Sequence, residues 1–137
     1  MHTRTHLLLI PGLFALMLGV ACGDEDESNG TAPTIDSLSY DPTTITVGSN
    51  NDVTASFNYA DPEGDVSMFQ INVSAPDGVV VPAIQGEVPG ATGQTAGAVT
   101  LVLSLNPPLA GSYDFTITIT DEAGNTSKGL SGTLTAQ

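Results

Sequence analysis

The chain has 137 residues, enough for one domain, and it is strongly acidic, since fifteen Asp and Glu against two Lys and Arg give a formal net charge of −13. Nucleic-acid binding needs clustered Lys and Arg to neutralise phosphates, so this composition excludes it. The single cysteine, Cys22, cannot form an internal disulfide.

Residues 1–21 have the organisation of a secretory signal peptide. A basic start with Arg4 precedes an apolar run over residues 7–20, which is too short to span a bilayer as a helix. A buried core helix is the alternative reading, but amphipathic spacing is absent. Removal of residues 1–21 would leave Lys128 as the only basic residue and no histidine. Histidine–cysteine zinc sites and nucleophile systems that need histidine are then excluded from the mature chain.

The sequence LGVAC, residues 18–22, resembles the lipobox of bacterial lipoproteins. Gly19 departs from that pattern, where an aliphatic residue is usual. The resemblance implies that Cys22 becomes the first mature residue and carries a diacylglycerol and an amide-linked acyl chain such as palmitate. Several acyl chains together make membrane attachment nearly permanent. Gly23, in place of an aspartate, favours the outer membrane of the cell envelope. Ordinary cleavage that leaves a free thiol, or intermolecular pairing, are the alternatives for Cys22.

Residues 22–32, CGDEDESNGTA, are expected to form an acidic tether. The segment has no large apolar residue that could join a core, and its four consecutive acids repel one another. We expect an extended spacer here, with a specific partner-binding segment as the alternative.

Residues 33–137 are expected to form one all-β domain, because apolar and polar residues alternate with a period of two and no helical spacing occurs. The clearest strands lie at 52–59, 98–105 and 112–120, and weaker ones at 34–40, 44–47, 66–74, 79–84 and 127–135. Residues 86–98 hold four glycines and are expected to form a long loop that joins the sheets, with a binding loop as the alternative. About seven short strands predict a single Ig-like antiparallel β-sandwich. Its expected core comprises Phe57, Tyr59, Phe69, Ile71, Leu101, Leu103, Phe115, Ile117 and Ile119.

Two stretches resemble the Ig-like modules of bacterial surface and secreted proteins, in the PKD-like, cadherin-like and bacterial Ig-like groups. They are YADPEGDVSMFQINV, residues 59–73, and GSYDFTITITDEAGNTS, residues 111–127. The tryptophan–aspartate–phenylalanine hallmark of PKD domains is missing, so no subgroup is assigned. The resemblance implies a non-catalytic spacer or adhesive unit. Tyr113 is either the tyrosine corner of the fold or a plain boundary residue.

Two acidic loops are expected to meet at one end of the sandwich, because the loops after the second and sixth Ig strands lie together. They are DPEGD, residues 61–65, and DEAGN, residues 121–125. Calcium prefers six to eight hard oxygen ligands. The candidate ligands are Asp61, Glu63, Asp65, Asp121 and Asn125, with Glu122 beside them. Ordinary turn chemistry is the alternative, since Asp, Asn, Gly and Pro all favour turns.

The tether is expected to enter at this acidic end, because the first strand pairs antiparallel with the second. The acidic loops would then face the membrane. We expect a lipid-anchored, non-catalytic envelope protein with one binding or structural module, whose protein or glycan partner is unknown. One alternative is a calcium-dependent adhesion module. Another is a hydrolase using Asp61 and Asp121 as its acid–base pair, which the lack of an aromatic sugar platform and of a second domain disfavours.

Overall fold

The computed structural model describes residues 30–79 and 81–137. The expected signal peptide, Cys22 and the tether up to residue 29 lie outside the described residues. Among the residues it describes, no helix is both long enough and apolar enough to cross a membrane.

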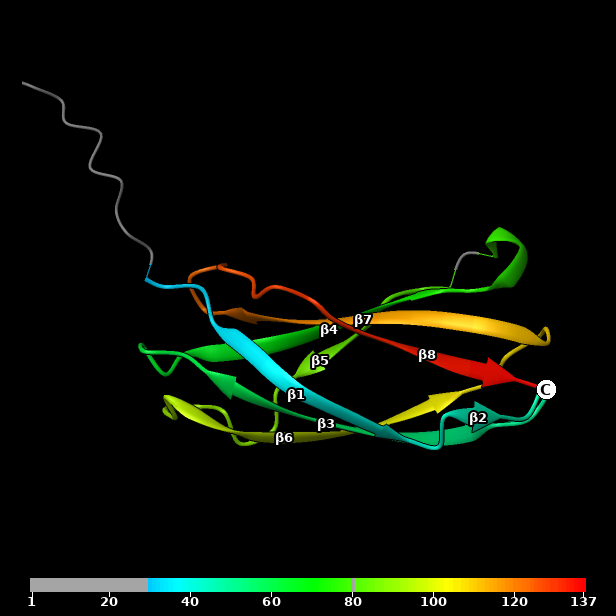
Figure 1. Ribbon diagram of the computed structural model, residues 1–137. Helices are drawn as coiled ribbons and strands as arrows, with labels where there is room; N and C mark the ends of the chain where they lie inside the picture. The colour runs from blue at the N-terminus through cyan, green and yellow to red at the C-terminus, as the bar shows by residue number, and fades with distance from the viewer. Residues whose placement is uncertain (1–29, 80) are drawn as a thin grey trace, which may run out of the picture.

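The described residues form two stacked β-sheets and one short 3-10 helix (Figure 1). One sheet has the strand order β1-β3-β6, and the other has the order β2-β8-β7-β4-β5. The elements are β1 (Thr34–Asp41), β2 (Thr44–Ile45), β3 (Asn51–Ala60), β4 (Val66–Ser74), η1 (Pro76–Gly78), β5 (Ile84–Glu87), β6 (Ala96–Leu105), β7 (Gly111–Asp121) and β8 (Leu130–Ala136). The predicted Ig-like sandwich is confirmed, although β2 pairs with β8 in parallel.

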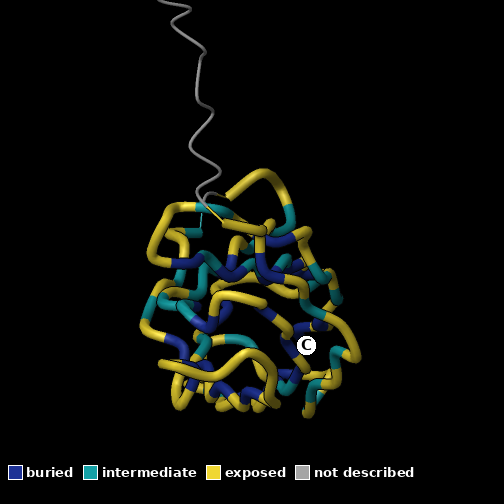
Figure 2. The backbone as a smooth tube through the Cα atoms, turned by 90° about the vertical axis from the view of Figure 1, so that its left-hand side faces the viewer, coloured by how far each residue is buried: buried dark blue, intermediate teal, exposed yellow. Residues whose placement is uncertain are grey.

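The core lies between the two sheets because alternate residues of each strand point inward. Along β3, for example, Val53, Ala55, Phe57 and Tyr59 are buried while the residues between them are more exposed. Figure 2 colours the backbone by burial and shows short buried stretches between exposed ones. Eight of the nine predicted core residues are buried, and Phe69 is partly buried. Each large buried side chain contributes about 1.5–3 kcal/mol before entropy. The buried core side chains of the described segments lie within residues 33–137, so we expect that part of the chain to fold without the residues before it.

Of the two alternatives for Tyr113, the hydrogen bonds of its side chain match the tyrosine corner. Its hydroxyl donates a hydrogen bond to the carbonyl oxygen of Leu109 (2.9 Å) and accepts one from the Leu109 N–H (3.3 Å). The ring itself is buried. The two hydrogen bonds therefore join the loop at Leu109 to the beginning of β7.

The predicted strand at 79–84 is wrong, because β5 begins only at Ile84. Valines at 79–81 gave that segment a strand-like composition, but Pro82 has no N–H to donate to a sheet ladder. The predicted loop at 86–98 is correspondingly too long, since β5 runs to Glu87 and β6 starts at Ala96. The last strand likewise starts at Leu130 rather than at residue 127.

The chain enters the sandwich at the end that carries the two acidic loops, as predicted. Thr34 pairs with Ala60 at the start of β1, and the Thr31 N–H donates a hydrogen bond to Oε1 of Glu63 (3.1 Å). The C-terminus lies at the opposite end (Figure 1). Residues 30–33 therefore lie beside the 61–65 loop.

Candidate metal centre

The loop at residues 61–65 is a tight turn whose sequence explains its shape. The Gly64 N–H donates a hydrogen bond to the carbonyl oxygen of Asp61 (3.1 Å). Aspartate first, proline second and glycine fourth are the residues that a type I turn favours. The Asp65 N–H then donates to Oδ2 of Asp61 (2.9 Å). One oxygen of Asp61 is therefore used to hold its own loop.

The loop at residues 121–125 is built in the same way. The Gly124 N–H donates to the carbonyl oxygen of Asp121 (3.2 Å), and the Asn125 N–H donates to Oδ1 of Asp121 (2.7 Å). Both glycines have positive φ angles, +70° at Gly64 and +91° at Gly124, which glycine adopts at little cost. The two loops share the pattern Asp-x-x-Gly-x, so turn chemistry accounts for the position of each leading aspartate.

The loops differ at their fifth residue, and the difference is chemical. The side-chain amide of Asn125 donates a second hydrogen bond, to Oδ2 of Asp121 (2.8 Å). Asp65 stands at the equivalent position of the first loop, where an ionised carboxylate has no hydrogen to donate. As a result, Oδ1 of Asp61 and Oδ1 of Asp65 are both buried without a hydrogen-bond partner.

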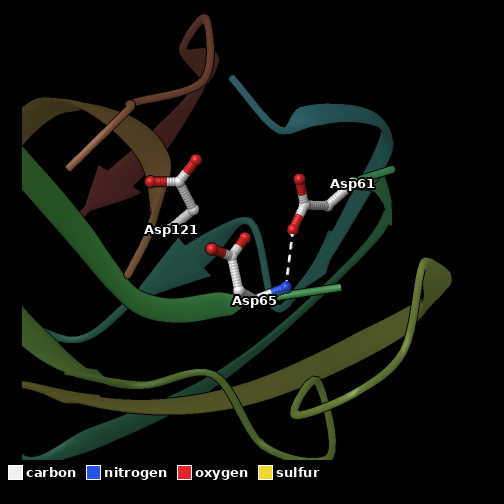
Figure 3. Close-up of side chains that lie close together, drawn as sticks. All are labelled: Asp61, Asp65 and Asp121. Carbon is white, nitrogen blue, oxygen red and sulfur yellow. Dashed lines mark hydrogen bonds between the residues drawn. The ribbon is translucent and has the colours of Figure 1, made fainter. Parts of the chain in front are cut away.

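The topology brings three carboxylates of these loops together (Figure 3). One oxygen from each of Asp61, Asp65 and Asp121 lies within 4.8 Å of the others. Asp61 is 0% exposed and Asp121 is 3% exposed, while Asp65 is half-buried. The Glu122 N–H donates to the carbonyl oxygen of Asp65 (3.0 Å) and so joins the two loops directly.

The electrostatics of the cluster oppose a full set of negative charges. Burial raises the pKa of Asp65 above 3.8. A hydrogen bond that the protonated group could share with Asp61 raises this pKa further, as do the charges of Asp61 and Asp121, while a backbone hydrogen bond acts in the opposite direction. Lys128 is the one basic residue of the described segments. A proton or a cation would relieve the repulsion within this cluster.

The other predicted ligands lie at the edge of this cluster. Glu63 accepts the Thr31 N–H described above, and Asn125 orients the carboxylate of Asp121. Glu122 contributes its backbone N–H to Asp65. The assignments of Glu63 and Asn125 as ligands stay predictions.

Sequence reasoning missed the role of segment 88–95, whose backbone is hydrogen-bonded to the 61–65 loop. The Asp61 N–H donates to the carbonyl oxygen of Thr95 (2.8 Å), and the Gly93 N–H donates to that of Gly64 (2.9 Å). Val88 and Ala91 are buried in the core. A glycine-rich segment with two small or medium apolar residues carries no periodic signal, so only the tertiary contacts show this role.

The three carboxylates could hold a metal ion. Their oxygens are hard ligands of the type that calcium and magnesium prefer. A spread of at most 4.8 Å does not exceed twice a Ca–O distance of about 2.4 Å. Any two of the oxygens could therefore contact one calcium ion, and the third would also reach it where the spacing lies slightly below that limit.

No protein-family model and no curated protein matches the chain. Among solved structures, the chain is similar to the PKD domain of an M14-like peptidase from Thermoplasmatales archaeon SCGC AB-540-F20, at 22% identity and a TM-score of 0.55, covering 78% of this chain and 97% of that one. It is also similar to the alkylpurine DNA glycosylase AlkC of Pseudomonas fluorescens bound to DNA, at 13% identity and a TM-score of 0.52, covering 79% of this chain and 31% of that one. A further similar structure is the CARDB domain of the PF1109 protein of Pyrococcus furiosus in complex with di-metal ions, at 10% identity and a TM-score of 0.44, covering 77% of this chain and 86% of that one. At these identities the likeness shows the fold, an Ig-like sandwich, and nothing about activity.

Proposed function

We propose that this protein is a non-catalytic, lipid-anchored module of the bacterial cell envelope whose acidic end binds calcium. The observation that carries the calcium site is the pair of buried carboxylate oxygens, on Asp61 and Asp65, that have no hydrogen-bond partner beside a third carboxylate. Buried acceptors without partners are costly and rare in folded proteins. A divalent cation would satisfy both oxygens and offset two of the three negative charges of the cluster.

Calcium suits the site better than a transition metal does. The cluster offers only carboxylate oxygens, whereas copper, zinc and iron sites generally recruit nitrogen or sulfur ligands. Three protein carboxylates leave several of the six to eight calcium positions for water or backbone carbonyls. An affinity of about 10⁻⁴–10⁻³ M is typical of extracellular calcium modules. Such a site fills only where calcium is abundant, outside the cytoplasm.

The burial of the candidate acid–base pair supports a non-catalytic role. A hydrolase built on Asp61 and Asp121 would need a substrate bond between the two carboxylates. Asp61 is 0% exposed and Asp121 is 3% exposed, so a sugar could not reach both groups without opening the loops. Glycan-hydrolysis screens of the wild type and of Asp61→Asn test this point, and an activity lost in the variant would contradict the proposal.

Lipid anchoring rests on the sequence around Cys22 and agrees with the way the chain enters the domain. The acyl chains would attach to residue 22, eight residues before Gly30, where the described chain begins beside the acidic loops. An anchor on Cys22 would therefore hold the calcium end toward the outer membrane and present the opposite end to a protein or glycan partner. Mass spectrometry of the N-terminal peptide of the mature protein tests the anchor, and an unmodified Cys22 would refute it.

Calorimetry and thermal melts of residues 30–137 with calcium test the metal site. With a Kd of about 10⁻⁴–10⁻³ M, about 10 mM calcium should stabilise the domain by about 1.4–2.7 kcal/mol. Asp61→Asn should abolish the shift. Asp41→Asn is the matched control, because it removes the same charge from an exposed site at the far end of β1. No heat and no shift in Tm with either calcium or magnesium would refute the site.

A further inference from the structure

Strand β6 forms one outer edge of the three-stranded sheet, and its hydrogen-bonded neighbour in that sheet is β3 alone. It is ten residues long, AGAVTLVLSL, and contains no charged residue and no proline. An edge strand of this kind presents a row of unpaired backbone groups to another chain. Val102, near its middle, is 65% exposed.

The alternation of the β3–β6 ladder shows which backbone groups face outward. The hydrogen bond from Asp61 N to Thr95 O continues the register in which Ala60 pairs with Ala96. Hydrogen-bonded and non-hydrogen-bonded pairs alternate along an antiparallel ladder. The even-numbered residues of β6, including Thr100 and Val102, therefore direct their N–H and C=O groups to the open side.

The other outer edges of the two sheets carry the devices that block pairing. Strand β1 is interrupted by a bulge between Asp36 and Ser39, with Ser37 at φ +59°. Strand β5 is four residues long and ends in a glutamate, and β2 has two residues. Short strands, bulges and charges are common protections of exposed edges. Among the described strands, β6 is the long edge that has none of them.

We propose that β6 pairs antiparallel with β6 of a second copy of this chain, across a two-fold axis. The distribution of charge favours pairing through β6 over other contacts between two copies. The chain carries fifteen acids, so most contacts between two copies would oppose like charges, whereas two β6 strands bring together ten uncharged residues each. A two-fold axis needs one self-complementary patch, and antiparallel pairing of a strand with itself supplies it.

Sedimentation velocity of residues 30–137 over a range of concentrations tests the pairing. We expect a monomer–dimer equilibrium that strengthens as salt increases, because salt screens the net repulsion between the two acidic copies. In hydrogen exchange, the outward N–H groups of Thr100 and Val102 should be protected at high concentration and exposed at low concentration. A monomer at all concentrations up to about 1 mM, which corresponds to a binding free energy weaker than about −4 kcal/mol, would overturn the proposal.

Two variants and one control locate the interface. Val102→Lys places like charges on the paired strands and should weaken dimerisation at least about tenfold. Thr100→Pro removes an outward N–H and the exposed hydroxyl hydrogen bond to Ser56 of β3 (3.0 Å), but no backbone hydrogen bond to β3. It should therefore also weaken the dimer while the monomer keeps its fold by circular dichroism. Met68→Lys is the matched control, because Met68 is an exposed apolar residue of the other sheet, and it should leave the dimer intact. A dimer that survives both β6 variants would place the interface elsewhere and refute the proposal.

Discussion

Replacing Asp65 by asparagine tests the cluster at the position where the two acidic loops differ. In the 121–125 loop, the amide of Asn125 donates to the second oxygen of Asp121 (2.8 Å). In the 61–65 loop, Asp65 cannot make that bond, and Oδ1 of Asp61 has no partner. The two loops share the glycine N–H bond to the aspartate carbonyl and the fifth-residue N–H bond to the aspartate carboxylate. An asparagine amide at position 65 should therefore reach Oδ1 of Asp61. The substitution should therefore stabilise the calcium-free domain and remove its calcium site.

The size of the effect follows from the buried acceptor on Asp61. Leaving such an acceptor without a partner costs about 1–3 kcal/mol, and Asp61 is fully buried. Recovering part of that cost should add about 1–2 kcal/mol to the free energy of unfolding without calcium. For a domain of about 105 residues, this corresponds to a rise in Tm of about 5–10 °C. The calcium-induced shift of the wild type, about 6–12 °C at about 10 mM, should fall close to zero in Asp65→Asn.

The assay is a thermal melt of the wild type and Asp65→Asn, each in EDTA and in calcium, with Asp41→Asn as the charge-matched control. In EDTA, we expect Asp65→Asn to have a higher Tm than the wild type. Calcium should raise the Tm of the wild type and leave that of the variant unchanged. Asp41→Asn should behave as the wild type in both buffers, since its side chain is exposed and distant from the cluster. A variant less stable than the wild type in EDTA would show that the carboxylate of Asp65 is stabilising without an ion, and a full calcium shift in the variant would remove Asp65 from the site.

Three further predictions follow from the described contacts. In EDTA, the wild type should lose stability relative to Asp65→Asn as pH rises from 3.8 through the raised pKa of Asp65, because the folded state binds the proton of Asp65 more tightly than the unfolded state does. Urea unfolding at several pH values measures the difference in free energy of unfolding, and a difference that does not change with pH would contradict the prediction. Tyr113→Phe should cost about 0.5–1.5 kcal/mol by loss of the hydrogen bonds to Leu109, with calcium affinity unchanged by calorimetry. Gly132→Ala should cost about 1–3 kcal/mol in urea unfolding, because its Cβ would lie 2.5 Å from Cζ of Phe115, and a neutral result would show that the ring can move.

The fold could be predicted from the sequence because burial on one face imposes a period of two. Val53, Phe57 and Tyr59 reveal β3 without any knowledge of its partners. The prediction at 79–84 failed because it was based on valine-rich composition and not on alternation. Pro82 and the preceding 3-10 helix at Pro76–Gly78 did not allow a strand there. Local composition is thus a weaker guide to a strand than alternation, because a strand also requires a neighbour to bond.

The position of the candidate site could also be predicted, but the burial and hydrogen bonding of its carboxylate oxygens could not. Turn-forming residues located the two loops, and the Ig topology placed them together, as the 4.8 Å cluster shows. Which oxygens are left without partners depends on the segment 88–95 and on how deeply the loops are packed. Val88 and Ala91 of that segment are buried in the core, and neither carries a pattern that marks it as part of a site.

The two acidic loops differ in how they satisfy their leading aspartate. Both loops close with an aspartate, a glycine three residues later and a backbone N–H to the aspartate carboxylate. The second loop satisfies its buried aspartate with an asparagine at the fifth position. A single change to asparagine would give the first loop the same solution, so the carboxylate at position 65 is not needed to form the turn. Local choices that lower stability without structural need are expected at functional sites. The unsatisfied pair formed by Asp61 and Asp65 is such a choice, and a bound cation is the ligand that would reverse its cost.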